Sequence, residues 1–142
     1  MRLNWSWLLA LGCALNAHAA GRLVVENAWI PVPPPGVMML AGYATLRNAG
    51  DAPLVISGAQ SESFADVSLH YSFERDGLSR MRSVDELDVQ AGSYRVLEPG
   101  GYHLMLMRPK RELKAGDTVK IHISTNSGDG ADAEFVVREP AP

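Results

Sequence analysis

Cysteine is almost absent from this chain. Its single cysteine, Cys13, lies in an N-terminal segment that we expect to be removed before the protein folds. A folded domain without a thiol has no disulfide, no thiol redox chemistry, no cysteine nucleophile and no zinc–thiolate site. The same absence excludes a blue-copper electron-transfer centre, because that centre requires a thiolate ligand.

The N-terminal segment, residues 1–19, has the pattern of a signal peptide. Arg2 supplies one positive charge, an apolar run extends from Trp5 to about Leu15, and Ala17-His18-Ala19 is a small-x-small cleavage site. The apolar run is too short to span a bilayer. We therefore expect cleavage after Ala19 and a periplasmic location without a membrane span.

The surroundings of Cys13 leave a second form of processing open. The sequence Ala10-Leu11-Gly12-Cys13 has a weak resemblance to a lipoprotein cleavage box, but the usual leucine three residues before the cysteine is missing. Lipidation at Cys13 is therefore the alternative to cleavage after Ala19.

Positive charge is also scarce. Lysine and arginine number 13 against 16 acidic residues, and the net charge of −3 becomes −4 when Arg2 leaves with the signal. Because no basic stripe exists, nucleic acid is not an expected partner.

Helical periodicity is nearly absent as well. Short runs of alternating apolar and polar residues recur between turn signals, which is typical of an all-β sandwich or barrel. We expect a Greek-key β-sandwich of eight or nine strands in residues 20–138, followed by a short tail at 139–142. The expected strands cover residues 23–30, 37–47, 53–57, 65–74, 78–84, 94–97, 100–107, 118–125 and 133–138.

One strand carries unusual side chains. In residues 100–107 the alternation places Leu104 and Leu106 on one face and His103, Met105 and Met107 on the other. The leucines suit a core. An imidazole and thioethers on the opposite face are half of a soft-metal site.

The other half is expected on the hairpin of residues 65–84. There Val67, Leu69, Tyr71 and Phe73 should face the core, which places His70 on the opposite face.

With Asp76-Gly77 as a two-residue turn, Arg75 pairs with Leu78 and Ser72 with Met81. Met81 then becomes the diagonal neighbour of His70 on the same face. This register is an assumption, since a slip by one residue would move Met81 to the other face.

The four side chains form a neutral, soft donor set of two imidazoles and two thioethers. Thioethers are poor ligands for zinc, calcium or magnesium and suit Cu(I). Imidazole must be neutral to bind, so affinity should fall as the pH drops through about 6.5. The predicted ligands are His70, Met81, His103 and Met105.

Other residues of the same types are less easily assigned. Met107 either fills the core or flanks the site, and Met38 and Met39 either pack or line its rim. His122 has no methionine near it in sequence and is expected to be a surface residue.

The spacing H-x10-M-x21-H-x-M resembles the signature of the periplasmic PCu(A)C copper chaperones. The resemblance covers nearly all of the chain after residue 19 and includes Ala28-Trp29, Pro33-Pro34-Pro35-Gly36 and Pro99-Gly100-Gly101-Tyr102. It implies a cupredoxin-like sandwich that binds one Cu(I) per chain through the four predicted ligands.

The family resemblance also implies a task. Such proteins are thought to carry copper to the CuA centre of cytochrome c oxidase, often beside a Sco-type partner. Some members bind a second copper with a His- and Met-rich C-terminal extension, whereas this chain ends in Arg138-Glu139-Pro140-Ala141-Pro142. A second site of that kind is not expected.

Two other functions remain compatible with the sequence. The same ligands would serve copper sequestration or resistance, and a metal-free sandwich would use the methionine face to bind a partner. No residue set offers a nucleophile with a positioned base, so we do not expect an enzyme.

Overall fold

A computed structural model of the chain describes residues 19–142. The expected signal segment, including Cys13, therefore lies outside the described residues apart from Ala19. Within residues 19–142, no helix has the length and apolar character needed to cross a membrane.

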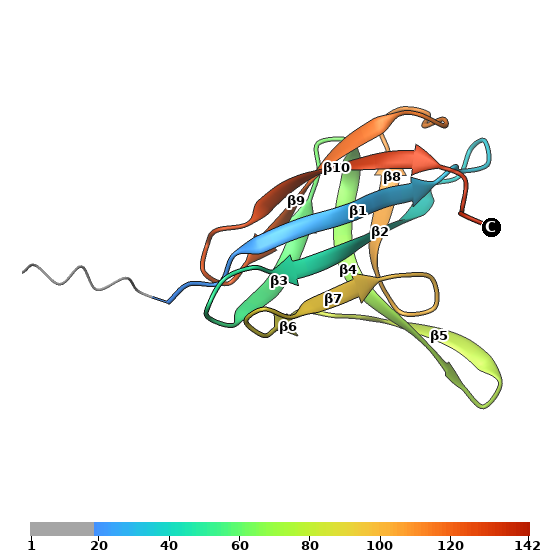
Figure 1. The fold of residues 1–142 in the computed structure, drawn as a ribbon. Coiled ribbons are helices and arrows are strands. Elements are labelled where there is room, and N and C mark those ends of the chain that lie inside the picture. Colours follow the sequence, from blue (N-terminus) through green and yellow to red (C-terminus); the bar gives the residue numbers. More distant parts are fainter. Residues whose placement is uncertain (1–18) are drawn as a thin grey trace, which may run out of the picture.

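Ten β-strands make up the described part of the chain, and they hydrogen-bond in the order β5-β4-β8-β7-β2-β1-β10-β9-β3-β6 (Figure 1). The strands are β1 (Leu23–Pro31), β2 (Met39–Asn48), β3 (Leu54–Gln60), β4 (Phe64–Arg75), β5 (Leu78–Ser83), β6 (Leu87–Val89), β7 (Tyr94–Leu97), β8 (Tyr102–Pro109), β9 (Thr118–Thr125) and β10 (Ala131–Arg138).

The expected strand count of eight or nine is thus too low. The missed strand is β6, which is only three residues long and pairs with β3. So short a segment gives no alternation to detect. The other nine strands lie where the alternation places them. Strand β1 ends at Pro31, where the proline loop of residues 31–36 begins, because proline cannot donate a hydrogen bond within a sheet.

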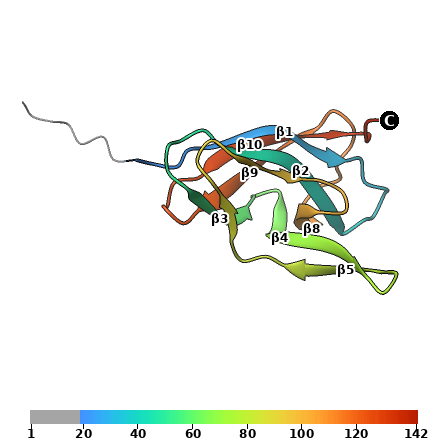
Figure 2. The ribbon, with the colours of Figure 1, turned by 60° about the horizontal axis from the view of Figure 1, so that its bottom comes forward.

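Two layers enclose the core. Strands β1, β9 and β10 lie on one side, and β4 and β8 lie on the other (Figure 2). The layers meet at Gly42 of β2, where an added Cβ would lie 3.4 Å from the Phe135 ring of β10 and 3.5 Å from Leu104 of β8. Phe135, Leu104 and Leu106 are at most 1% exposed. The first and last strands, β1 and β10, pair in parallel and complete the sandwich.

The core also contains one buried polar side chain that the sequence does not reveal. Asn48 lies just after the strand expected at residues 37–47, yet it ends β2 and is fully buried. Its side-chain amide donates to the carbonyls of Ala52 and Val89, and its oxygen accepts from the backbone N–H groups of Arg22 and Gly50. These hydrogen bonds connect Arg22, at the start of the domain, to the loop after β2.

The hairpin of β4 and β5 projects from the sandwich (Figures 1 and 2). Strand β5 pairs with β4 alone, and every residue of β5 is exposed. The prediction that Tyr71 and Phe73 belong to the core is wrong, because both lie in the projecting end of β4 and are only half-buried. Val67 and Leu69, nearer the sandwich, are buried as predicted.

Candidate metal centre

The turn of the β4–β5 hairpin sets the position of Met81. Asp76 and Gly77 have φ angles of 54° and 72°, the left-handed pair that a two-residue type I′ turn requires. Arg75 therefore pairs with Leu78 and Ser72 with Met81. This is the predicted register, and it leaves Met81 diagonal to His70.

Strand β8 completes the arrangement on the other side of β4. His70 lies directly opposite His103, and Ser68 lies opposite Met105. The two imidazole rings are stacked, with centroids 6.1 Å apart and planes 27° from parallel. The register of three adjacent strands thus brings the four predicted ligands to one face.

The orientation of His103 is fixed by the backbone. Its Nδ1 lies 3.1 Å from the carbonyl oxygen of Gly101, which also accepts a hydrogen bond from the N–H of Ser72. A carbonyl only accepts, so Nδ1 carries the proton and Nε2 presents its lone pair. That lone pair faces the sulfur of Met81, 3.1 Å away. A ligand imidazole whose other nitrogen donates to a carbonyl is a common arrangement at metal centres.

His70 has one nitrogen without a partner. Nε2 lies 2.9 Å from the hydroxyl of Ser68, whereas the buried Nδ1 has no hydrogen-bond partner. A buried N–H without an acceptor is costly, so the favoured tautomer has Nε2–H donating to Ser68. Nδ1 is then a free lone pair, as a metal ligand must be.

The surroundings of His70 also keep its ring neutral. Burial lowers the pKa of His70 below its usual 6.5, and the nearby His103 lowers it further, while the carboxylate of Asp66 acts in the opposite direction. A neutral imidazole is the form that binds metal.

Access to the four side chains is uneven. His103 and Met105 are 7% and 9% exposed, whereas Met81 is 47% exposed on the edge strand β5. The face opposite the leucines of β8 is therefore more enclosed than strand alternation alone suggests. A bound ion would be reached through Met81.

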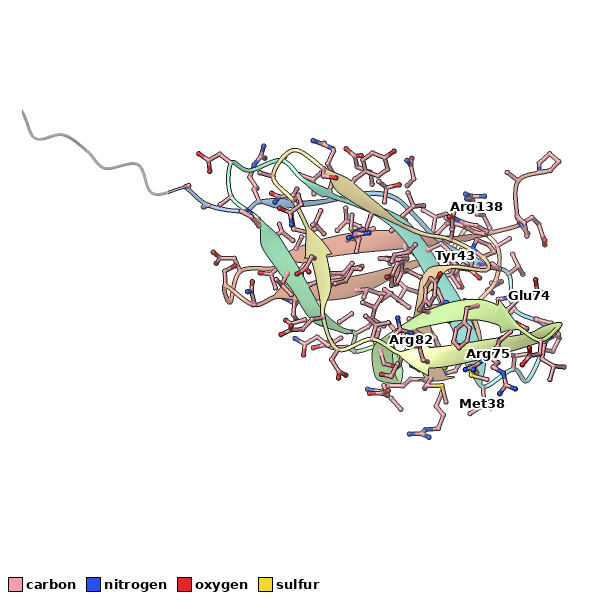
Figure 3. The ribbon with its side chains drawn as sticks, turned by 90° about the horizontal axis from the view of Figure 1, so that it is seen from below. Met38, Tyr43, Glu74, Arg75, Arg82 and Arg138 are labelled. Carbon is pink, nitrogen blue, oxygen red and sulfur yellow. The ribbon has the colours of Figure 1, made fainter. Side chains whose placement is uncertain are left out.

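Aromatic packing supports the hairpin from its other face. The Tyr71 ring lies 4.6 Å from that of Tyr102 and 6.2 Å from that of Phe73, and the guanidinium of Arg82 lies 5.6 Å from its centroid. Figure 3 labels Arg82 on this hairpin. Because Arg82 is directly opposite Tyr71, this packing holds β5, and hence Met81, against β4.

The remaining methionines lie on or near the same sheet. Met107 is half-buried on β8 and pairs with Met39, while Met38 directly precedes β2. Met38 and Met39 are both more than half exposed, so of their two expected alternatives the structure favours a position at the rim over packing in the core. No observation assigns Met107 to the core.

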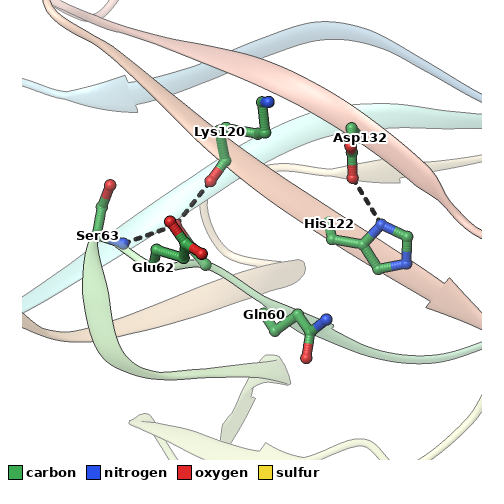
Figure 4. Close-up of a pocket in the computed structure, with 7 residues that line it drawn as sticks. Gln60, Glu62, Ser63, Lys120, His122 and Asp132 are labelled. Carbon is green, nitrogen blue, oxygen red and sulfur yellow. Dashed lines mark hydrogen bonds and ion pairs between the residues drawn. The ribbon is translucent and has the colours of Figure 1, made fainter.

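His122 lies elsewhere, as expected for a surface residue. Its Nδ1 is 2.7 Å from a carboxylate oxygen of Asp132, in a pocket that also includes Gln60, Glu62 and Lys120 (Figure 4). In residues 19–142 no three His, Cys, Asp or Glu side chains gather closely enough to hold a metal ion.

Two contributors to the site were not predicted. Ser68 orients His70, and it could have been found from the sequence, because it stands two residues earlier on the same strand face. The carbonyl of Gly101 orients His103, and no side-chain pattern reveals a backbone acceptor.

Known structures share this architecture. The apo PCuAC domain from PmoF1 has a TM-score of 0.70 and 21% identity, covering 87% of this chain and 98% of that one. The copper-bound PCuAC domain from PmoF2 has a TM-score of 0.69 and 20% identity, covering 87% and 97%. These likenesses confirm the predicted cupredoxin-like β-sandwich.

A third structure is also similar in sequence. The solution structure of CuI-DR1885 from Deinococcus radiodurans has a TM-score of 0.67 and 30% identity, covering 88% of this chain and 83% of that one. Among curated proteins, the putative lipoprotein Lxx21020 of Leifsonia xyli subsp. xyli (strain CTCB07) is 29% identical over 135 residues, which covers 89% of this chain and 79% of the relative.

A family model agrees with these likenesses over almost the whole sandwich. It is described as putative lipoprotein LpqE-like and matches residues 23–137. The protein belongs to the LpqE-like family and has the fold of PCuAC domains.

Proposed function

We propose that the protein is a periplasmic Cu(I) metallochaperone that delivers copper for assembly of the CuA centre of cytochrome c oxidase. The observation that carries the proposal is the contact between Nε2 of His103 and the sulfur of Met81. Because Nδ1 donates to the carbonyl of Gly101, Nε2 of His103 and the sulfur of Met81 both present lone pairs to each other. A cation bound by both atoms would stabilise this contact.

The donor set selects the ion. His70, Met81, His103 and Met105 supply two neutral nitrogens and two thioethers and no carboxylate, a combination that suits Cu(I) better than zinc or calcium. The unpartnered Nδ1 of His70 fits this role. The four donors are enough for one Cu(I) per chain.

Known copper proteins of this fold support the metal. The PCuAC domain from PmoF2 is described as copper-bound, and DR1885, 30% identical to this chain, is described in its CuI form. The proposal extends copper binding to this chain through its own donors.

The unequal exposure of the ligands suits transfer rather than permanent storage. Met81 lies on the edge strand β5 and is far more exposed than His103 and Met105. An incoming ligand from an acceptor would replace Met81 first, and the ion would pass through a mixed-ligand intermediate. The proposed activity is therefore ion transfer without chemical turnover.

Export to the periplasm fits both the sequence and the family. Residues 1–19 have the pattern of a signal peptide, and the family and the relative from Leifsonia carry the description of putative lipoproteins. The mass of the protein purified from an envelope fraction distinguishes cleavage after Ala19 from lipidation at Cys13.

The test measures binding and delivery together. The protein is loaded with one equivalent of Cu(I) and mixed separately with an apo CuA domain and an apo Sco-type protein, and copper is followed on each after separation. We expect competition with a Cu(I) chelator at micromolar concentrations or tighter, and transfer to at least one acceptor.

Each other result identifies a different function. Tight binding without transfer to either acceptor would point to sequestration or resistance. Failure to compete with the chelator would remove the copper function and leave an interaction sandwich.

A further inference from the structure

Two methionines outside the predicted ligand set lie beside each other on the same sheet. Met39 of β2 is directly opposite Met107 of β8, and Ala41 is directly opposite Met105. Met39 is 52% exposed, so it contributes little to a core.

The hydrogen bonds around this pair bring the two side chains close together. The N–H of Arg108 donates to the carbonyl of Met38 at 2.7 Å, one residue beyond the pair on each strand. This pattern makes Met39 and Met107 a non-hydrogen-bonded pair, the kind whose side chains approach most closely, with Cβ atoms about 4.5–5.5 Å apart. Two flexible thioethers at that separation can converge on one ion.

The pair is continuous with the candidate metal centre. Met107 and Met105 are two residues apart on β8 and share a face. Met39, Met107 and Met105 therefore form a row of thioethers from an exposed edge of the site to its enclosed interior. The neighbour of Met107 on β4 is the exposed Asp66, whose negative charge favours an approaching cation.

We propose that Met39 and Met107 form a second, weaker site for Cu(I), through which the ion enters or leaves by way of Met105. The inference rests on the proposed function, because it assumes that the four predicted ligands bind Cu(I). Two thioethers without an imidazole hold the ion less tightly than the mixed set, and this is what an entry site requires. Thioether ligation also makes the site accept Ag(I), a redox-inert ion of the same softness.

Met38 provides a matched control. It is 54% exposed and adjacent to Met39 in sequence, but neighbouring residues of an extended chain point to opposite sides. Met38, labelled in Figure 3, lines a pocket with the proline loop and Leu113 that does not include Met39, Met105 or Met107. Replacement of methionine by leucine keeps the side-chain volume, so the variants should fold.

The experiment uses protein whose methionine methyl groups carry ¹³C, titrated with Ag(I) and observed by ¹H–¹³C NMR. Residues 19–142 contain five methionines, so each signal can be assigned by single substitution. We expect the first equivalent to shift the methyl signals of Met81 and Met105, and the second equivalent to shift those of Met39 and Met107. The double variant Met39→Leu/Met107→Leu should lose the second event and keep the first, and Met38→Leu should keep both.

The two proposals fail in different ways. If the first equivalent leaves Met81 and Met105 unshifted, the proposed function is wrong. If the first event occurs but the second equivalent leaves Met39 and Met107 unshifted, or the double variant retains the second event, only the second site is wrong.

Discussion

Nε2 of His103 lies 3.1 Å from the sulfur of Met81, although the residues are 22 positions apart in the chain and on strands that do not pair with each other. Strand β4 separates them in the sheet, and the hairpin turn at Asp76-Gly77 determines which residue of β5 reaches across. The contact therefore depends on the register of two strand pairs at once. A shift of either register by one residue would break it.

Met81→Leu tests this contact without disturbing the fold. About half of the Met81 side chain is exposed and leucine has a similar volume, so the free energy of unfolding should change by no more than about 0.5 kcal/mol. Mutation of a residue that supports a metal ligand typically lowers metal affinity by roughly 10–100-fold. Loss of the Met81 thioether, a predicted ligand itself, should weaken Cu(I) binding by at least as much. Chelator competition measures the effect. Leu78→Ala, an exposed change on the same strand, is the control and should bind like the unmodified protein.

Ser68→Ala tests the residue that orients His70. Without the hydroxyl, Nε2 loses its partner at 2.9 Å, and the ring is free to rotate or to change tautomer. We expect Cu(I) affinity to fall by about 10-fold, the lower end of the range for such supporting groups. Ser68→Thr keeps the hydroxyl and should restore most of the affinity. Equal binding by the alanine and threonine variants would show that the hydrogen bond does not matter.

The titration of His70 should differ between the folded and unfolded protein. Because burial and His103 lower its pKa when folded, NMR should show the ring protonating below pH 6.5 in the folded protein and near about 6.5 in urea. Between these two pKa values the unfolded state binds more protons than the folded state. The stability that His70 contributes is therefore fully present above pH 6.5 and is lost as the pH falls towards the pKa of His70 in the folded protein. Proton competition with Cu(I) at His70 should also begin below pH 6.5.

Asp66→Asn gives an independent check of the same group. The carboxylate raises the pKa of His70, against the larger effect of burial, so its removal should move the titration of His70 to still lower pH. A shift to higher pH in this variant would contradict the assigned influence of Asp66.

Much of this structure follows from strand alternation. The side chains of Leu104 and Leu106 alternate with those of His103 and Met105 at a period of two, and a turn such as Asp76-Gly77 admits one favoured register. Those two rules are enough to place all four predicted ligands on one face. Their assignment as metal ligands stays a prediction.

Strand alternation does not predict features that depend on how the strands are arranged in three dimensions. It assigns Tyr71 and Phe73 to the core because it carries no information on where the sandwich ends and the hairpin begins to project. It treats the face of His103 as an open polar side, although neighbouring strands and the hairpin cover most of it. The carbonyl of Gly101 as the partner of His103 depends on a backbone position that no residue type encodes.

Asn48 illustrates the same limit and allows a test of stability that is separate from copper. Asn48→Ala removes four hydrogen bonds and leaves one backbone group each of Arg22, Gly50, Ala52 and Val89 without its side-chain partner. Since each buried polar group left unsatisfied costs about 1–3 kcal/mol, we expect a loss of about 3 kcal/mol and a fall in Tm of about 10 °C. Thermal unfolding measures both. Asn126→Ala, at an exposed turn, should change stability by less than about 0.5 kcal/mol. Asn48 makes no hydrogen bond to the four predicted ligands, so Cu(I) affinity below the melting transition should be the same in both variants. If Asn48→Ala and Asn126→Ala have the same Tm, the hydrogen bonds of Asn48 do not hold the start of the domain.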